Sequence, residues 1–266
     1  MPARADPAVD ALTAPPAARS YRPWRGLAAA ITLLTIVPLP GAVAGAELGA
    51  APVWFPLVGA AVGGLAGGVR ILCGPLLGDT VATVLAMIAL VIVTGALHQD
   101  GLADTADGLG VRGDRARRLE VMRDSATGVF GALALISWAL LLLATLASLD
   151  GDRALRALVV ACALARWAAL VHAVATPAAR SDGLGAGLRV GRYTFAAATV
   201  LAVAVALIVG GLGPGAIAVA TSALVAASSA VFARRTLGGR TGDTLGATVA
   251  VTEVVVCVVL LAVWHG

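Results

Sequence analysis

The chain has 266 residues, of which 59% are hydrophobic and 13% charged, and its formal net charge is +4 at neutral pH. Soluble globular proteins have about 45–50% apolar and about 25% charged residues, so this composition excludes an ordinary water-soluble domain and predicts a protein that faces lipid. All nineteen basic residues are arginines, most of them in short segments between apolar runs. This placement indicates membrane orientation as the role of the positive charge, and we expect no nucleic-acid partner.

The expected architecture is an all-α, polytopic integral membrane helix bundle. Residues 1–23 are rich in alanine and proline and predict a disordered cytosolic tail, which leaves 24–266 as one transmembrane catalytic domain. A helix needs about 20 apolar residues to cross a hydrocarbon core of about 30 Å. About seven spans are predicted, at 53–72, 80–99, 128–148, 153–176, 194–211, 215–233 and 246–264.

The segment 26–40 is shorter and ends in two prolines, which interrupt a helix. Arginines gather in the N-terminal tail and in 100–127, and both regions should lie on the cytoplasmic side. An even number of spans must then separate them, and 53–72 and 80–99 already supply two. We therefore expect 26–40 to be re-entrant or interfacial, and every polar, glycine-rich segment to lie on the cytoplasmic face.

Six of the fifteen acidic residues fall within residues 98–128. Asp100, Asp104 and Asp107 are spaced i, i+4 and i+7, so on a helix they share one face and repel one another unless a cation lies among them. Mg²⁺ takes oxygen ligands of this kind and often bridges carboxylates to substrate phosphates. Asp124 is a candidate fourth ligand or catalytic base. The alternative interpretation is a solvated, charged loop that caps a transmembrane helix.

The same stretch contains glycines at 101, 108 and 110, which we interpret as allowing a phosphate or a metal to approach the backbone. Its arginines suit a clamp on a pyrophosphate, because the guanidinium fork matches phosphate oxygens. Arg112 and Arg123 stand nearest to the carboxylates in sequence and are the candidates. A purely topological signal remains the alternative for each arginine.

Two further polar segments adjoin spans, at 179–192 and 234–253. Arg180 in the first, and Gly239, Thr241 and Asp243 in the second, are candidate substrate-binding residues because helix N-termini favour phosphate. Taken singly, each segment also fits an ordinary tight turn. Neither a P-loop nor a strand-linked dinucleotide-binding motif occurs.

Two charged residues lie deep inside predicted spans, where charges are costly. We expect Arg166 and Glu253 to be paired or to line the substrate site. His98 directly precedes the carboxylates, and either a ligand role or a hydrogen bond at the helix end fits it. The glycines of 55–68 predict close helix packing.

Several motifs together carry a resemblance to a known family. They are "FPLVGAAVGG" (55–64), "HQDGLADTADGLG" (98–110), "VMRDSATGVFGALAL" (121–135), "ARSDGLGAG" (179–187) and "GGRTGDTLGA" (238–247), followed by Glu253. In this order they resemble the cobalamin synthase family of adenosylcobinamide-GDP ribazoletransferases, over nearly the whole chain from about residue 24.

The resemblance implies an integral enzyme of the bacterial inner membrane that uses Mg²⁺. Such an enzyme joins GDP-activated adenosylcobinamide to α-ribazole or its 5′-phosphate and releases GMP, late in vitamin B12 synthesis. Asp100, Asp104, Asp107 and Asp124 would hold the metal. Asp124, or otherwise Asp107, would accept the proton of the attacking hydroxyl. The oligomeric state stays open, with a homo-oligomer as one option.

Residues 104–112, "DTADGLGVR", are also similar to the first half of the CDP-alcohol phosphatidyltransferase motif, with valine at 111 in place of alanine. The fold is thus expected to resemble those enzymes around the active site. The second half of that motif is not reproduced, because position 121 is valine and only Asp124 follows nearby. A lipid head-group transferase is the rival enzyme. A transporter is the rival from another class, but no internal repeat supports it.

Overall fold

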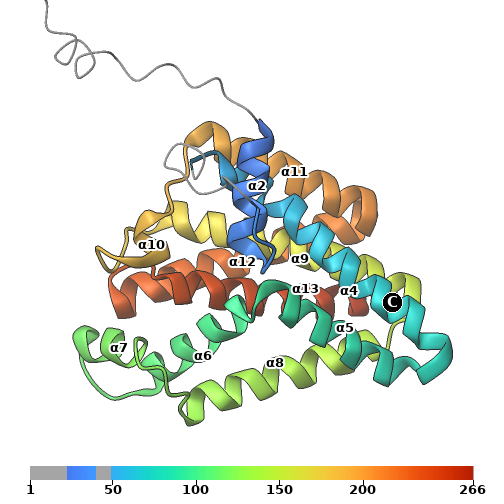
Figure 1. Cartoon of the computed structure of the whole chain (residues 1–266), viewed down its shortest axis with the longest axis horizontal. Helices are drawn as coiled ribbons and strands as arrows, with labels where there is room; N and C mark the ends of the chain where they lie inside the picture. Colours follow the sequence, from blue (N-terminus) through green and yellow to red (C-terminus); the bar gives the residue numbers. More distant parts are fainter. Residues whose placement is uncertain (1–22, 40–48, 266) are drawn as a thin grey trace, which may run out of the picture.

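The computed structural model describes residues 23–39 and 49–265, so the tail prediction for 1–23 lies outside the described residues apart from Pro23. Within them the regular structure is helical, with one isolated bridge between Ala178 and Arg240. The elements in chain order (Figure 1) are α2 (Pro23–Leu34), η1 (Ala51–Trp54), α4 (Phe55–Leu77), α5 (Asp79–Thr94), α6 (Leu97–Gly110), α7 (Arg115–Val121), α8 (Val129–Ala147), α9 (Gly151–Ala175), α10 (Gly183–Gly187), α11 (Arg192–Gly210), α12 (Leu212–Leu237) and α13 (Gly242–His265).

Six of these helical segments are long and apolar enough to cross a membrane, and a seventh is counted if α5 and α6 form one bent span. The six correspond to the predicted spans that begin at 53, 128, 153, 194, 215 and 246. Helix α2 has only 12 residues, which is too short for a crossing. Its re-entrant or interfacial placement stays a prediction.

The predicted span 80–99 is wrong as a single straight helix. Helix α5 ends at Thr94, and α6 leaves it at an angle of 88°. The bend lies at Gly95 and Ala96, whose φ angles of 60° and 58° are left-handed and cannot continue an α-helix. The acidic residues of 100–107 therefore lie on a separate helix, α6, which points away from the axis of α5.

Helix α9 occupies the middle of the bundle and contacts α4, α11, α12 and α13. The close approach of α4 depends on Gly59 and Gly63, where an added Cβ would overlap the carbonyl groups of Cys162 and Leu158 on α9. Small residues let helix backbones approach closely in membranes, where apolar burial from water gives no drive for association. The predicted packing role of the glycines in 55–68 is confirmed at these two positions.

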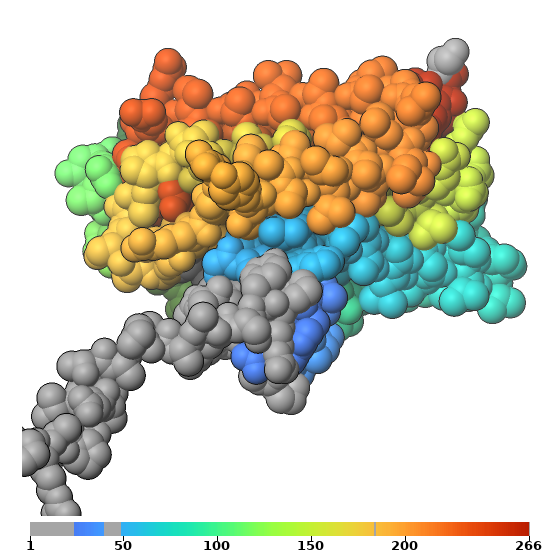
Figure 2. Space-filling view, turned by 90° about the horizontal axis from the view of Figure 1, so that it is seen from above, coloured from blue at the N-terminus to red at the C-terminus, as the bar shows by residue number. Residues whose placement is uncertain are grey.

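The outer surface of the bundle is apolar, as a lipid-facing protein requires. Large exposed side chains include Leu133 and Leu140 on α8, and Val200 and Ile208 on α11. Helices α4, α11 and α12 run side by side along one face (Figure 2). The polar connections 111–128, 176–191 and 238–241 gather at one end of the long axis, opposite the C-terminus (Figure 1). The prediction that these segments share one side of the bundle is confirmed.

Candidate active site at the polar end of the bundle

The site is formed where α6 crosses the first turns of α13. Two glycines make the crossing close: an added Cβ on Gly101 would lie 2.7 Å from the carbonyl oxygen of Asp243, and one on Gly246 would lie 3.2 Å from that of Leu97. Any larger side chain would push the helices apart. The crossing brings acidic residues of α6 next to Asp243, a juxtaposition that sequence spacing does not reveal.

The interpretation of the glycines as openings for a ligand is wrong for Gly108 and Gly110, whereas Gly101 both packs against α13 and lines a polar pocket. Protein atoms fill the space beside each of them: α13 beside Gly101, Met122 and the Arg118 carbonyl beside Gly108, and the Phe130 ring beside Gly110. These glycines allow α6 to pack against its neighbours. Gly108 and Gly110 benefit the site only indirectly, because they set where the aspartates lie.

Carboxylates from α6 and α13 form the electrostatic centre of the site. Asp104 is half-buried on α6, where the carboxylates of Asp100, Asp107 and Asp243 repel it and Arg180 attracts it. Within residues 23–39 and 49–265, no three His, Cys, Asp or Glu side chains are grouped so that they could hold a metal ion by themselves. The four-aspartate metal site therefore stays a prediction. A cation shared with substrate phosphates needs only one or two carboxylates.

Asp107 has a different environment from its neighbours on α6. Its two oxygens accept hydrogen bonds from the backbone N–H groups of Gly128 at 2.7 Å and Gly131 at 2.8 Å. These groups belong to the start of α8, whose positive end favours a carboxylate. Asp107 thus caps α8 and fixes it to α6. Its predicted catalytic and metal-binding roles would compete with this contact.

Asp124 lies after α7 with an exposed side chain, and its carboxylate accepts a hydrogen bond from the Ala126 N–H at 3.0 Å. In the described part of the chain, no hydrogen bond or ion pair connects it to the aspartates of α6. Arg112 is also exposed. One guanidinium nitrogen of Arg123, Nη2, donates to both carboxylate oxygens of Asp182, with each distance at 2.9 Å. Asp182, which the sequence did not single out, thus attaches the segment after α7 to the segment after α9.

Arg180 is the candidate that the structure places most directly among the carboxylates. Its guanidinium lies 3.5 Å from Asp243, and it donates a 2.7 Å hydrogen bond to the carbonyl of Leu119. The Arg180 side chain is 15% exposed and that of Asp243 25% exposed, so the pair is shielded yet reachable from solvent. Arg180 provides a positive charge at the edge of the carboxylate cluster. This arrangement suits a diphosphate bound together with a cation, because the cation can pair with the carboxylates while Arg180 pairs with phosphate oxygens.

The loop 238–241 has a mainly structural part. The backbone of Gly239 packs against the Pro177 carbonyl, and the Thr241 hydroxyl accepts from the Thr244 N–H at 3.1 Å, which caps α13. The same hydroxyl lies 3.3 Å from an oxygen of Asp243. Thr241 thus orients Asp243, whereas no contact assigns Gly239 to a substrate.

Arg240 was missed as an important residue. Its guanidinium donates to the carbonyls of Gly185, at 2.9 Å, of Leu188, at 3.2 Å, and of Thr176. Burial lowers the pKa of this guanidinium, although arginine stays charged at neutral pH. Arg240 lies in a glycine-rich loop between the site candidates Gly239 and Thr241, and this position was the available signal. The carbonyl groups that it binds lie more than fifty residues away in sequence, so sequence spacing could not identify them.

Arg166 and Glu253 form an ion pair between α9 and α13, with side chains 1% and 2% exposed. The prediction that these deep charges are paired is confirmed. Arg166 also lines a pocket, whereas the carboxylate of Glu253 contacts Cys162 at 3.6 Å. Their direct contact with a substrate stays a prediction.

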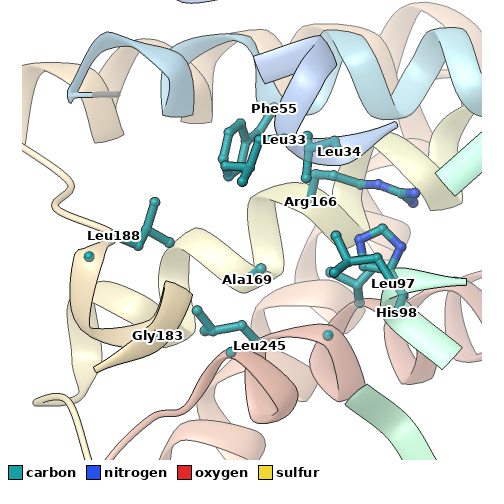
Figure 3. A pocket seen from close by; sticks show the side chains of 14 residues that line it. Leu33, Leu34, Phe55, Leu97, His98, Arg166, Ala169, Gly183, Leu188 and Leu245 are labelled. Carbon is teal, nitrogen blue, oxygen red and sulfur yellow. The ribbon is translucent and has the colours of Figure 1, made fainter. Parts of the chain in front are cut away.

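Two adjoining pockets open at this end. The polar pocket, of about 150 Å³, is lined by four charged residues and five others: Asp100, Arg180, Asp182, Asp243, Leu97, Gly101, Gly183, Thr241 and Gly242. The apolar pocket, of about 210 Å³, lies between α2, α4, α6, α9 and α13 (Figure 3). The two share the lining residues Leu97, Gly183 and Gly242. One continuous site thus has a charged part and an apolar part.

A lipid-facing bundle with a charged pocket at one end defines the class: a polytopic membrane protein whose site takes a polar or charged ligand. The chain belongs to the cobalamin-5-phosphate synthase family, whose model matches residues 26–261. No solved structure gave a significant match.

Curated relatives match most of the chain, and the three that follow are named adenosylcobinamide-GDP ribazoletransferase. The protein of Roseiflexus sp. (strain RS-1) is 41% identical over 247 residues, which cover 89% of this chain and 91% of the relative. That of Azorhizobium caulinodans is 38% identical over 251 residues, covering 89% and 95%. That of Klebsiella pneumoniae is 37% identical over 245 residues, covering 88% and 98%.

Proposed function

We infer that this chain is an adenosylcobinamide-GDP ribazoletransferase of cobalamin biosynthesis. It joins GDP-activated adenosylcobinamide to α-ribazole or its 5′-phosphate and releases GMP. The observation that carries this inference is the family match over residues 26–261, together with relatives of this name at 37–41% identity over most of both chains. The continuous site, with its charged and apolar parts, supports a substrate that combines phosphates with organic groups.

The polar pocket is the proposed site of the diphosphate. Carboxylate oxygens are ligands that Mg²⁺ prefers. The carboxylates of Asp100, Asp104 and Asp243 repel one another, and a cation bound at the pocket would relieve this repulsion. When bound there with the diphosphate, the ion would neutralise charge that develops on the phosphate oxygens. Asp243 replaces Asp107 in this proposed set, because the oxygens of Asp107 already bind backbone N–H groups of α8.

The transfer itself needs few protein groups. A ribazole hydroxyl oxygen forms a bond to the cobinamide-side phosphorus, and the bond from that phosphorus to the bridging oxygen of GMP breaks. The bridging oxygen keeps the electron pair, and GMP leaves. Arg180 stabilises negative charge on the diphosphate from the edge of the pocket. Asp124 remains the proposed acceptor of the hydroxyl proton. It directly follows Arg123 in the chain, and Arg123 binds Asp182, which lines the polar pocket.

The same proposal places the protein in the bacterial inner membrane, with the polar end on the cytoplasmic side. The arginine-rich connections at that end support this orientation. An arrangement like that of CDP-alcohol phosphatidyltransferases around the carboxylates, and a possible homo-oligomeric assembly, also belong to the proposal. The bilayer is the expected partner of the apolar surface.

The test is nucleotide release by the purified full-length protein in detergent or liposomes. We expect GMP from GDP-activated adenosylcobinamide and α-ribazole with Mg²⁺, and none after chelation until Mg²⁺ is restored. Asp104→Asn should lower the rate by at least about a hundredfold, whereas Asp114→Asn, at the exposed N-cap of α7, is the matched control and should not. Release of CMP from a CDP-lipid, without GMP, would instead identify the rival phosphatidyltransferase.

A further inference from the structure

The apolar pocket has a shape and chemistry of its own. Phe55 and Leu33 form one wall and Leu245 the opposite wall, with Leu188 at one end (Figure 3). Arg166 and His98 lie together at the other end, and they are the only side chains with charged or strongly polar groups among the described lining residues. Two N–H groups of Arg166, Nε and Nη2, are buried without an acceptor in the described part of the chain. The pocket is therefore an apolar slot with two polar side chains, an arginine and a histidine, at one end.

Size and polarity decide among the parts of the two substrates. A volume of about 210 Å³ is too small for a corrin macrocycle. Guanine presents several donors and acceptors along its edge, and burying them without partners is costly. None of the described lining residues is acidic, so the guanine donors would find no carboxylate there. A benzimidazole has two fused apolar rings and one free ring nitrogen that accepts a hydrogen bond, which matches an apolar slot with polar side chains at one end.

We propose that this apolar pocket binds the benzimidazole base of the α-ribazole acceptor. The inference rests on the proposed function. The shared residues Leu97, Gly183 and Gly242 then separate the base from the charged groups of the polar pocket. Gly183 has a φ of +81°, a conformation that favours glycine, so the backbone turns at the junction without a side chain in the way. The ribose of the acceptor would extend through this junction towards the diphosphate.

The first experiment compares two acceptors that differ in the size of the base, α-ribazole and its naphthimidazole analogue. Leu245→Ala removes part of one wall and should raise the ratio of kcat/KM for the larger acceptor over the smaller by about tenfold or more, since single methylenes in apolar pockets already discriminate strongly. Leu260→Ala is the matched control, because Leu260 is a buried leucine of the same helix outside the pocket. A ratio is independent of the folded fraction.

The second experiment fills the slot. Leu188→Trp should raise KM for α-ribazole by about tenfold or more and leave KM for GDP-activated adenosylcobinamide unchanged, because Leu188 is a half-buried pocket residue. Three outcomes would overturn the proposal: an unchanged acceptor ratio in Leu245→Ala, an equal change in Leu260→Ala, or a Leu188→Trp effect confined to the GDP-activated substrate. Failure of the proposed function is distinguishable, since the unmodified protein would then release no GMP from any acceptor.

Discussion

The ion pair between Arg166 and Glu253 provides a sharp test of how the bundle tolerates charge in its interior. Both side chains are nearly inaccessible, and they join the central helix α9 to α13. Glu253→Gln keeps the size of the side chain but leaves the Arg166 guanidinium buried without a counter-charge. Removing one partner of a buried pair costs about 3–5 kcal/mol, so the free energy of unfolding should fall by about that amount.

The double substitution Arg166→Met with Glu253→Leu should recover most of the loss, because an apolar pair of similar volume needs no desolvation of charge. Reversible unfolding in mixed micelles checks these values. It is measured for the unmodified protein, for both variants and for Asp182→Asn, which disrupts an exposed ion pair. Asp182→Asn should cost no more than about 1 kcal/mol, since its contact with Arg123 is exposed. The reasoning would be refuted if Glu253→Gln lowered the free energy of unfolding as little as Asp182→Asn does. It would also be refuted if the double variant were less stable than Glu253→Gln alone.

Two further predictions concern contacts that attach the polar end to the bundle. Asp107→Ala removes two hydrogen bonds to the start of α8 and should lower the free energy of unfolding by about 1.5–3 kcal/mol. Gly131→Ala places a Cβ against the Asp107 carboxylate and disturbs the same contact, so it should destabilise the double variant little further. Melting shifts that add up in the double variant would contradict this shared cause. Arg240→Lys keeps the charge but cannot make three directed contacts, so proteolysis of the 176–191 segment should accelerate, whereas exposed Arg235→Lys should behave like the unmodified protein. Equal cleavage rates for both lysine variants would count against the bracing role of Arg240.

Local sequence determined the helices of this protein because the bilayer imposes a simple length requirement. Seven apolar stretches met it, and the structure has one continuous helix at six of them and the bent pair α5 and α6 at the seventh. The spacing of Asp100, Asp104 and Asp107 also identified one helix, and α6 carries all three. The same periodicity could not reveal the 88° bend before α6, because two residues with left-handed backbone produce it, and only one of them is glycine.

Which charges meet was decided by helix crossings that connect residues far apart in sequence. Asp243 joins Asp100 and Asp104 because glycines at 101 and 246 let α6 and α13 touch, while Asp124, closer in sequence, lies exposed in a turn. Asp107 fits the acidic spacing, yet it binds backbone N–H groups at the start of α8. A sequence states which side chains can carry charge and how often they recur along a helix. Only packing determines which backbone amide, arginine or carboxylate lies opposite each one, because interactions between charges depend on distance and burial in space.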